Sequence, residues 1–263
     1  MKHKKDDNNI NGTSVSKNES FLLSKINEKE LLVFGVGEAI SLTGWSRDRV
    51  CNTLASLERK GIIARVRRNA YALSNDLPKN IFAVATEAIK PSYISFWTAL
   101  SYYGFTEQQV MVVQLVSTRQ FRPFYAAPFR CEVVKFKISK FFGYRKIDRF
   151  VIAEKEKALI DSLSRLDLCG GLSEYAKSLK NAWPSLDKKK FAEYLIKFGN
   201  KSVISRIGFL TEHMGLSFPE ADRLLPYRSS SFTSLDPRAT RTNCYNNKWH
   251  IIINAEIGRE GSE

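Results

Sequence analysis

Five polar side chains are spaced so that they share one face of a helix between residues 46 and 60: Arg47, Arg49, Asn52, Thr53 and Ser56. Arginine, threonine and serine reach phosphates, whereas arginine and asparagine pair with guanine and adenine edges in a major groove. The face therefore predicts hydrogen bonding to DNA, and Arg49 and Asn52 are the best candidates for base readout.

The surrounding sequence predicts a pair of helices that position this face. Residues 38–42 form a short first helix, and Gly44 can take the left-handed conformation that ends it. Ser46 has the side-chain oxygen that an N-cap needs, so the second helix starts there and stops at Gly61. An apolar stripe of Val50, Leu54 and Leu57 lies opposite the polar face.

A basic hairpin is expected directly after the second helix. Residues 62–68 and 70–73 alternate in part, and they are hinged at Arg68 and Asn69, where asparagine tolerates positive φ. Arg65 and Arg67 lie near the tip with them. A charged helix face is as typical of a solvated surface as of DNA binding. The hairpin favours DNA, because helix, turn, helix and basic hairpin in this order are typical of a winged helix-turn-helix.

Composition agrees with a polyanionic partner. The 263 residues include 41 Lys+Arg against 27 Asp+Glu, a formal charge of +14. No apolar run approaches the ~20 residues of a membrane-spanning helix, and the charged N-terminus has no secretory signal. Four cysteines far apart indicate neither disulfides nor a zinc site. We expect a cytoplasmic protein with no metal, no cofactor and no membrane partner.

The fold class expected is α+β. Residues 1–18 read as a disordered arm, 19–78 as a winged helix-turn-helix domain, and 79–263 as a mixed α/β domain. In the last, strands are predicted at 110–116, 129–138, 147–153 and 249–255, and helices at 81–89, 93–103, 154–166, 172–183, 186–198 and 201–214.

A second basic segment spans residues 117–149, where nine cations face two anions. Its candidate contact residues are Arg119, Arg122, Arg130, Lys135, Lys137, Lys140, Arg145 and Lys146. Aromatic residues are interleaved with them, a composition that suits nucleic acid or another partner. The alternative is that the aromatics are the inward face of strands and the cations the outward face, as the alternation around Phe136 indicates.

Nothing in the sequence predicts catalysis. The three histidines are isolated, and the pair Gly170-Gly171 lacks the lysine of a phosphate-binding loop. Four carboxylates on or beside one helix are expected to be ordinary surface charges: Glu154, Glu156, Asp161 and Asp167. We therefore expect a protein that is not an enzyme.

The predicted winged helix is followed by four segments that, in this order, resemble the AbiEi family of type IV antitoxins. They are PSYISFWTALSYYGFTEQ (91–108), EKALIDSLSRLDLCGGLSEYAKSL (156–179), SRIGFLTEHMGL (205–216) and YRSSSFTSLDP (227–237). The resemblance implies an autorepressor that binds inverted repeats upstream of its own operon through the winged helix. It also implies a C-terminal domain that counters a nucleotidyltransferase toxin encoded next door.

Two other functions remain open from the residues. A stand-alone winged-helix transcription factor, with a C-terminal domain for sensing or dimerisation, would share every N-terminal feature. An RNA-processing or nucleotide-transfer enzyme is disfavoured, because the carboxylate or His/Cys constellation it needs is missing from the sequence.

Overall fold

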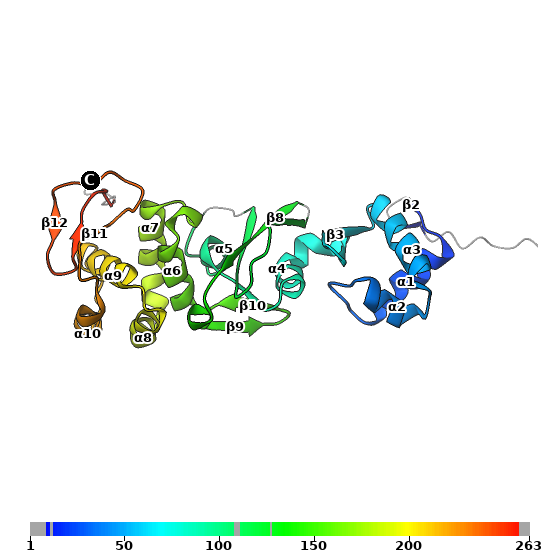
Figure 1. Cartoon of the computed structure of the whole chain (residues 1–263), viewed down its shortest axis with the longest axis horizontal. Coiled ribbons are helices and arrows are strands. Elements are labelled where there is room, and N and C mark those ends of the chain that lie inside the picture. The colour runs from blue at the N-terminus through cyan, green and yellow to red at the C-terminus, as the bar shows by residue number, and fades with distance from the viewer. Residues whose placement is uncertain (1–8, 11–12, 108–110, 127, 258–263) are drawn as a thin grey trace, which may run out of the picture. The chain divides into compact units, whose positions relative to one another are not determined.

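The computed structural model describes residues 9–10, 13–107, 111–126 and 128–257. The chain is a mixed α and β protein (Figure 1). It forms two compact units, Met1–Lys90 with Arg122–Glu132, and Pro91–Phe121 with Val133–Glu263. The division falls after Lys90 rather than after residue 78, because helix α4 (Leu77–Ala88) packs on strands of the first unit.

The first unit begins with helices α1 (Lys17–Glu28), α2 (Val36–Thr43) and α3 (Arg47–Arg59). An antiparallel hairpin of β3 (Ile63–Arg67) and β4 (Ala70–Leu73) follows. Ahead of α1, Asn9–Ile10 (β1) pairs with Thr13–Ser14 (β2). The helix thus starts inside the arm expected to reach residue 18, and residues 1–8 and 11–12 of that arm lie outside the described residues.

Local sequence signals fix the boundaries of α2 and α3. Gly44 ends α2 at a φ of 68°, in the left-handed conformation expected from the sequence. The Ser46 side chain then accepts a hydrogen bond from the Arg49 backbone N–H and caps α3. Beyond α3, Gly61 has a φ of 70°. The predicted start and stop of this helix are therefore confirmed.

The core of the first unit lies between α1, α3 and the hairpin. Leu22 and Ile26 of α1 meet Val50 and Leu54 of α3, and all four are almost fully buried. Phe34 forms a β-bridge with Tyr71, which ties the segment before α2 to β4. The apolar stripe predicted for α3 is thus its buried face.

Six further strands form a sheet in the order β7-β8-β6-β5-β10-β9. Their bounds are β5 Ser92–Ile94, β6 Val112–Ser117, β7 Phe124–Ala126, β8 Phe129–Lys135, β9 Tyr144–Ile147 and β10 Phe150–Ala153. β5 runs parallel to β10 and antiparallel to β6. Tyr93 and Ile94, expected in a helix, are therefore strand residues, and the helix they were assigned to, α5 (Phe96–Tyr102), starts after them.

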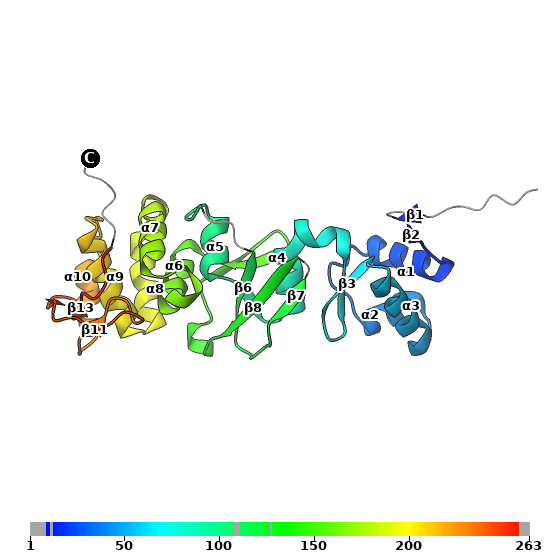
Figure 2. The same cartoon turned by 90° about the horizontal axis from the view of Figure 1, so that it is seen from above.

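Helix α6 (Lys155–Ser164) is central to the second unit. It contacts α5, α7 (Leu172–Ala182), α8 (Lys188–Phe198) and α9 (Lys201–His213), and Figures 1 and 2 show these helices gathered beside the sheet. The four helices predicted between 154 and 214 are confirmed to within two residues at each end. Short 3-10 turns occur at Ser74–Asp76 (η1), Ile138–Lys140 (η2), Leu166–Leu168 (η3), Trp183–Ser185 (η4) and Leu225–Tyr227 (η5).

A small three-stranded sheet follows α10 (Ala221–Leu224), with strands β11 (Thr233–Ser234), β13 (Ile251–Ile252) and β12 (Tyr245–Asn246). Trp249, which has no exposed surface, packs on α9 at Gly208. Across the described part of the chain, every helix is too short or too polar to cross a bilayer.

Candidate functional site

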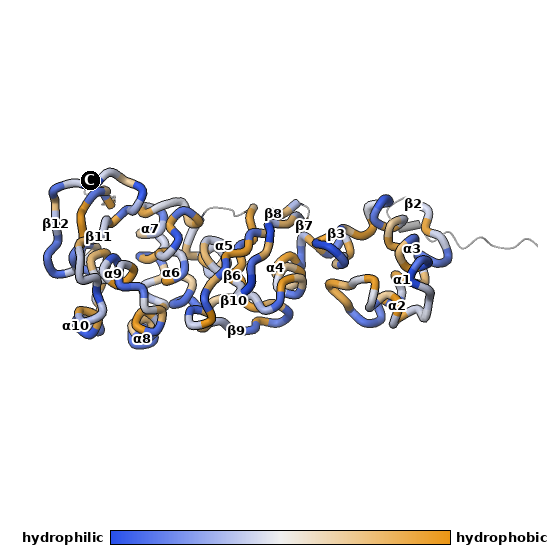
Figure 3. The backbone as a smooth tube through the Cα atoms, in the orientation of Figure 1, coloured by the Kyte–Doolittle hydropathy of each residue, from blue (hydrophilic) through white to orange (hydrophobic). Residues whose placement is uncertain are grey.

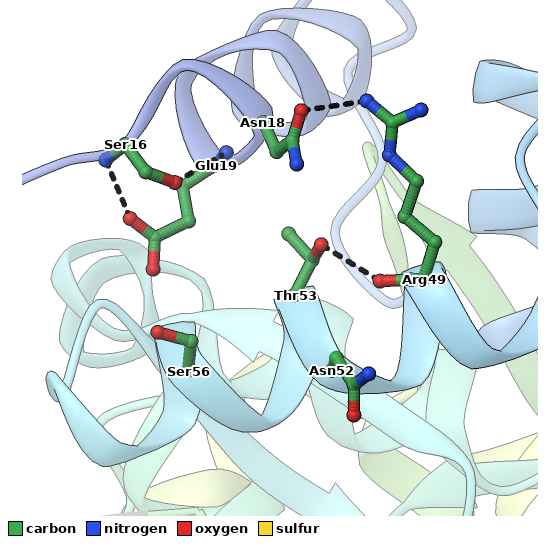
Figure 4. A pocket seen from close by; sticks show the side chains of 7 residues that line it. All are labelled: Ser16, Asn18, Glu19, Arg49, Asn52, Thr53 and Ser56. Atoms are coloured by element: carbon green, nitrogen blue, oxygen red, sulfur yellow. Dashed lines mark hydrogen bonds between the residues drawn. The ribbon is translucent and has the colours of Figure 1, made fainter.

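The outward face of α3 carries the first predicted contact residues. Arg47 and Asn52 are exposed, and neither has a hydrogen bond or ion pair with any described residue. Figure 4 shows Asn52 pointing away from α1. Both side chains are therefore available to a ligand, as the sequence predicts.

A shallow groove of about 460 Å³ lies between the first turn of α1 and the middle of α3 (Figure 4). All the residues that line it are of polar types: Ser16, Asn18, Glu19, Arg49, Asn52, Thr53 and Ser56. Four of the five α3 residues predicted to contact DNA thus border one groove, together with an α1 turn that the sequence does not associate with them.

Two of those four are less accessible than expected. Thr53 is only 7% exposed, and its hydroxyl donates to the Arg49 backbone carbonyl at 2.8 Å. Ser56 is half-buried and lines the groove beside Glu19. The expectation that Thr53 lies on an open face is wrong, because position 53 turns toward α1 rather than toward solvent.

Arg49 is exposed but held in place. Its Nη2 donates to Asn18 Oδ1 at 2.7 Å, as Figure 4 shows, and its guanidinium carbon lies 4.1 Å from the Trp45 ring centroid. A guanidinium over an indole face is an attractive cation–π arrangement. The orientation of this arginine is therefore set by residues on two other elements.

Glu19 links the first turn of α1 to Lys60, which follows the last turn of α3. Its carboxylate accepts a hydrogen bond from Lys60 Nζ at 2.7 Å, while Ser16 and Glu19 form a reciprocal capping box at the start of α1. Burial alone would raise the pKa of Glu19, but hydrogen bonds from Lys60, Ser16 and Ser56 outweigh it and lower that pKa to about 2. Glu19 is therefore ionised at neutral pH.

The hairpin turn has the predicted backbone. Asn69 has a φ of 58°, and the turn after β3 is strongly hydrophilic in Figure 3. Gly35 makes room for it, since a Cβ there would lie 2.4 Å from the Asn69 carbonyl oxygen. Arg68 is exposed and has no polar partner among the described residues.

The other two hairpin arginines are engaged within the first unit. Arg65 donates to Glu58 at 3.1 Å and to the Tyr71 hydroxyl at 3.0 Å. Arg67 donates to the Ala88 backbone carbonyl at 2.7 Å. Only Arg68 and Asn69 of the four predicted hairpin residues therefore form the open tip.

The cations of the second basic segment lie on several different elements. Lys135 on β8 and Arg145 and Lys146 on β9 lie four strands apart in the sheet order, roughly 19 Å at ordinary strand spacing. Arg119, Lys137 and Lys140 lie outside these strands in the second unit, whereas Arg122 and Arg130 belong to the first.

Most aromatic residues of this segment are buried or half-buried. Phe136 is 9% exposed and packs edge-to-face on Phe96 and Phe198, while its neighbours Lys135 and Lys137 are exposed. Of the interleaved rings, Tyr125 and Tyr144 are the exposed ones. The alternation of inward rings and outward cations is confirmed at Phe136.

A buried polar cluster joins α6 to β5. Lys157 and Asp161, one turn apart on α6, form an ion pair with no exposed side-chain surface. Asp161 also accepts hydrogen bonds from the Ser95 hydroxyl at 2.8 Å and the Tyr93 hydroxyl at 3.2 Å. Lys157 Nζ in turn donates to the Tyr93 hydroxyl at 2.9 Å. The expectation that Asp161 is a surface charge is wrong.

Four rings surround the Lys157 ammonium. Its Nζ lies 5.1 to 5.3 Å from the ring centroids of Phe142, Phe198, Phe136 and Tyr93. Burial lowers the pKa of Lys157 and raises that of Asp161, and the ion pair opposes both shifts. Because the pair is enclosed and its polar atoms have partners, the cluster ties α6 to β5.

Glu156 was also expected to be a surface charge, and this expectation is wrong as well. It is 5% exposed and accepts a hydrogen bond from the Asp187 backbone N–H at 3.1 Å, which ties α6 to the start of α8. Within the described ranges, no three His, Cys, Asp or Glu side chains gather as a metal site would require.

Comparison with known proteins yields a likeness in fold. No family model and no curated protein matches the chain. The crystal structure of the RV2827C protein from Mycobacterium tuberculosis is similar to 90% of this chain and 92% of its own, with a TM-score of 0.66 and 13% sequence identity. At that identity the likeness concerns the fold alone.

Sequence patterns could have found part of what was missed. Ser16 stands three residues before Glu19, the spacing of a capping box, which would have started α1 earlier and brought Asn18 onto a helix. The contact of Arg49 with Asn18 spans 31 residues, and no local pattern signals it.

Proposed function

We propose that this chain is a DNA-binding transcriptional repressor whose first unit is a winged helix-turn-helix. One observation carries the proposal: the open face of α3, with Arg47 and Asn52, is followed in the same unit by a positive-φ turn that exposes Arg68 and Asn69. A helix inserted in the major groove and a basic hairpin on the phosphates would use these two surfaces together.

The roles of the individual residues follow from their chemistry. Asn52 can form two hydrogen bonds with an adenine edge, and Arg49 can do the same with guanine, each at ~1–3 kcal/mol of discrimination. Arg68 is a point of contact for phosphate. Arg65 and Arg67 contribute charge from fixed positions and hold the hairpin against Glu58 of α3 and Ala88 of α4.

Titration of the full chain against a duplex from upstream of its own reading frame tests this proposal. Asn52→Ala should reduce the preference for that duplex over a scrambled one by about 10-fold, because a base contact is lost. Arg68→Ala should weaken both duplexes alike and lower the slope of log affinity against log salt by about 1, because a phosphate contact is lost. If neither change alters binding, the assignment is wrong.

We further propose that the protein acts as the antitoxin of a type IV toxin–antitoxin pair and represses its own operon at inverted repeats. The resemblance to AbiEi antitoxins over segments of the second unit supports this role. Co-expression with a nucleotidyltransferase encoded next to it should restore growth, and should still do so with Asn52→Ala and Arg68→Ala combined. A stand-alone transcription factor would leave such a toxin active.

A further inference from the structure

We propose that Asn18 and Trp45 are positioning residues that fix Arg49 for base readout, which makes the first turn of α1 part of the DNA-binding surface. This inference rests on the proposed DNA-binding function. It concerns a set of contacts that lie outside the recognition face expected from the sequence.

The first support is a stack of three side chains from three parts of the unit. The rings of Phe21 on α1 and Trp45 in the turn before α3 are stacked with centroids 5.6 Å apart and planes 30° apart. The Arg49 guanidinium lies on the Trp45 ring, 4.1 Å from its centroid. One face of the guanidinium is therefore covered, and its plane is set by the indole.

The second support is the hydrogen bond that fixes the arginine within that plane. Asn18 Oδ1 accepts from Arg49 Nη2 at 2.7 Å, and Figure 4 shows the Arg49 side chain extended from α3 toward Asn18. A guanidinium has five N–H groups. Among the described residues Arg49 has no other hydrogen bond, so four N–H groups remain to meet a guanine edge or a phosphate.

The third support is that the first turn of α1, which carries Asn18, is itself held in place by hydrogen bonds. The capping box of Ser16 and Glu19 fixes the first turn of α1, and Lys60 Nζ binds both the Glu19 carboxylate and the Ser14 backbone carbonyl. The first turn of α1 is thereby tied to α3 near both ends of that helix. Asn18 is consequently a fixed acceptor.

Fixing a long side chain before binding has a definite consequence for affinity. An arginine that is already ordered loses less rotamer freedom when it meets a base, and its planar donors are presented in one direction. Loss of either support should therefore reduce binding through Arg49 by about two- to tenfold, the fold-change that corresponds to ordering one long side chain.

Five single variants, Arg49→Ala among them, and one double variant of the full chain test the inference. Binding is measured on the duplex from upstream of its own reading frame and on a scrambled duplex. Asn18→Ala and Trp45→Leu should each lower the ratio of the two affinities about two- to tenfold. Trp45→Phe keeps an aromatic face under the guanidinium, so its ratio of affinities should stay close to that of the unaltered chain. Asn27→Ala, the same substitution at an exposed position of α1, should leave it unchanged.

The Asn18→Ala/Arg49→Ala double variant separates positioning from a merely structural role. If Asn18 acts through Arg49, the double variant should bind like Arg49→Ala alone. An equal loss from Asn18→Ala with and without Arg49 would overturn the inference, as would an unchanged ratio for Asn18→Ala while Asn52→Ala lowers it. If the unaltered chain shows no preference for its own upstream duplex, the proposed function itself fails, and the inference fails with it.

Discussion

At the scale of single residues, Glu19 links the fold of the first unit to pH. Its pKa falls from 4.5 to about 2 on folding, so the folded state favours the ionised form. A carboxylate with a lowered pKa stabilises the protein at every pH above the unfolded value, and this contribution is lost as pH falls from 4.5 through 2. The contribution is at most about 3 kcal/mol.

Glu19→Gln should therefore lower the free energy of unfolding at pH 7 by up to about 3 kcal/mol, and the difference from the unaltered chain should disappear near pH 2. Urea unfolding across that pH range measures it. Glu28→Gln is the matched control on α1: its side chain is 56% exposed in an ion pair with Lys25, so its effect should stay within about 1 kcal/mol. If the free energies of unfolding of Glu19→Gln and of the unaltered chain differ by the same amount at every pH, this role of Glu19 is refuted.

At the scale of elements, the buried Lys157–Asp161 pair joins α6 to β5. Lys157→Met alone should cost about 3–5 kcal/mol of unfolding free energy, because it leaves the Asp161 carboxylate buried without its cation. Adding Asp161→Leu should recover much of that loss. Lys177→Met removes a surface pair on α7 and should change stability by less than about 1 kcal/mol. If Lys157→Met and Lys177→Met change the free energy of urea unfolding equally, the claim that the buried pair joins α6 to β5 is contradicted.

Helix α9 and the small C-terminal sheet meet at a glycine. A Cβ on Gly208 would lie 2.3 Å from the Trp249 indole, so Gly208→Ala should destabilise the protein by about 1–3 kcal/mol although alanine favours helices. Gly37→Ala in α2, where a Cβ meets nothing within 4 Å, should instead stabilise by up to about 1 kcal/mol. Thermal unfolding of the two variants should show shifts of opposite sign.

Much of this element structure could be predicted from the sequence. The ends of α3, the left-handed Gly44 and the positive φ at Asn69 all follow from local cap and turn chemistry. Strand β5 could not, because Tyr93 and Ile94 continue an aromatic run that is typical of the helix after them. Their strand state depends on pairing with β6 and β10, which are distant in sequence.

The candidate site was predictable in composition but not in accessibility. Residue types and helix spacing identify the five polar α3 side chains, yet the same spacing places Thr53 and Ser56 equally well on an open face or toward a neighbour. Only the packing of α1 decides between these. The same limit explains Asp161, whose partners Ser95 and Tyr93 lie more than 60 residues away in sequence.

At the scale of the whole molecule, the question is where the charge of +14 acts. A diffuse excess would attract any polyanion from any direction. The structure separates the exposed cations with a polar partner in the protein, such as Arg65 and Arg67, from those with none among the described residues, such as Arg47 and Arg68. The cations of residues 117–149 are dispersed over the sheet and over both units.

The most direct test compares two triple variants of the full chain that lose the same charge in different places. One variant changes Arg47, Arg68 and Arg59, which lies in the last turn of α3, to Ala; the other changes Lys135, Lys137 and Lys146 to Ala. All six are exposed and have no polar partner among the described residues. Binding to the upstream duplex is titrated over a range of salt concentrations. We predict that the first triple variant loses at least about 10-fold in affinity and up to about 3 in salt slope, while the second stays close to the unaltered chain. Equal losses in both variants would show that net charge rather than the α3 and hairpin surface binds DNA, and would contradict the account.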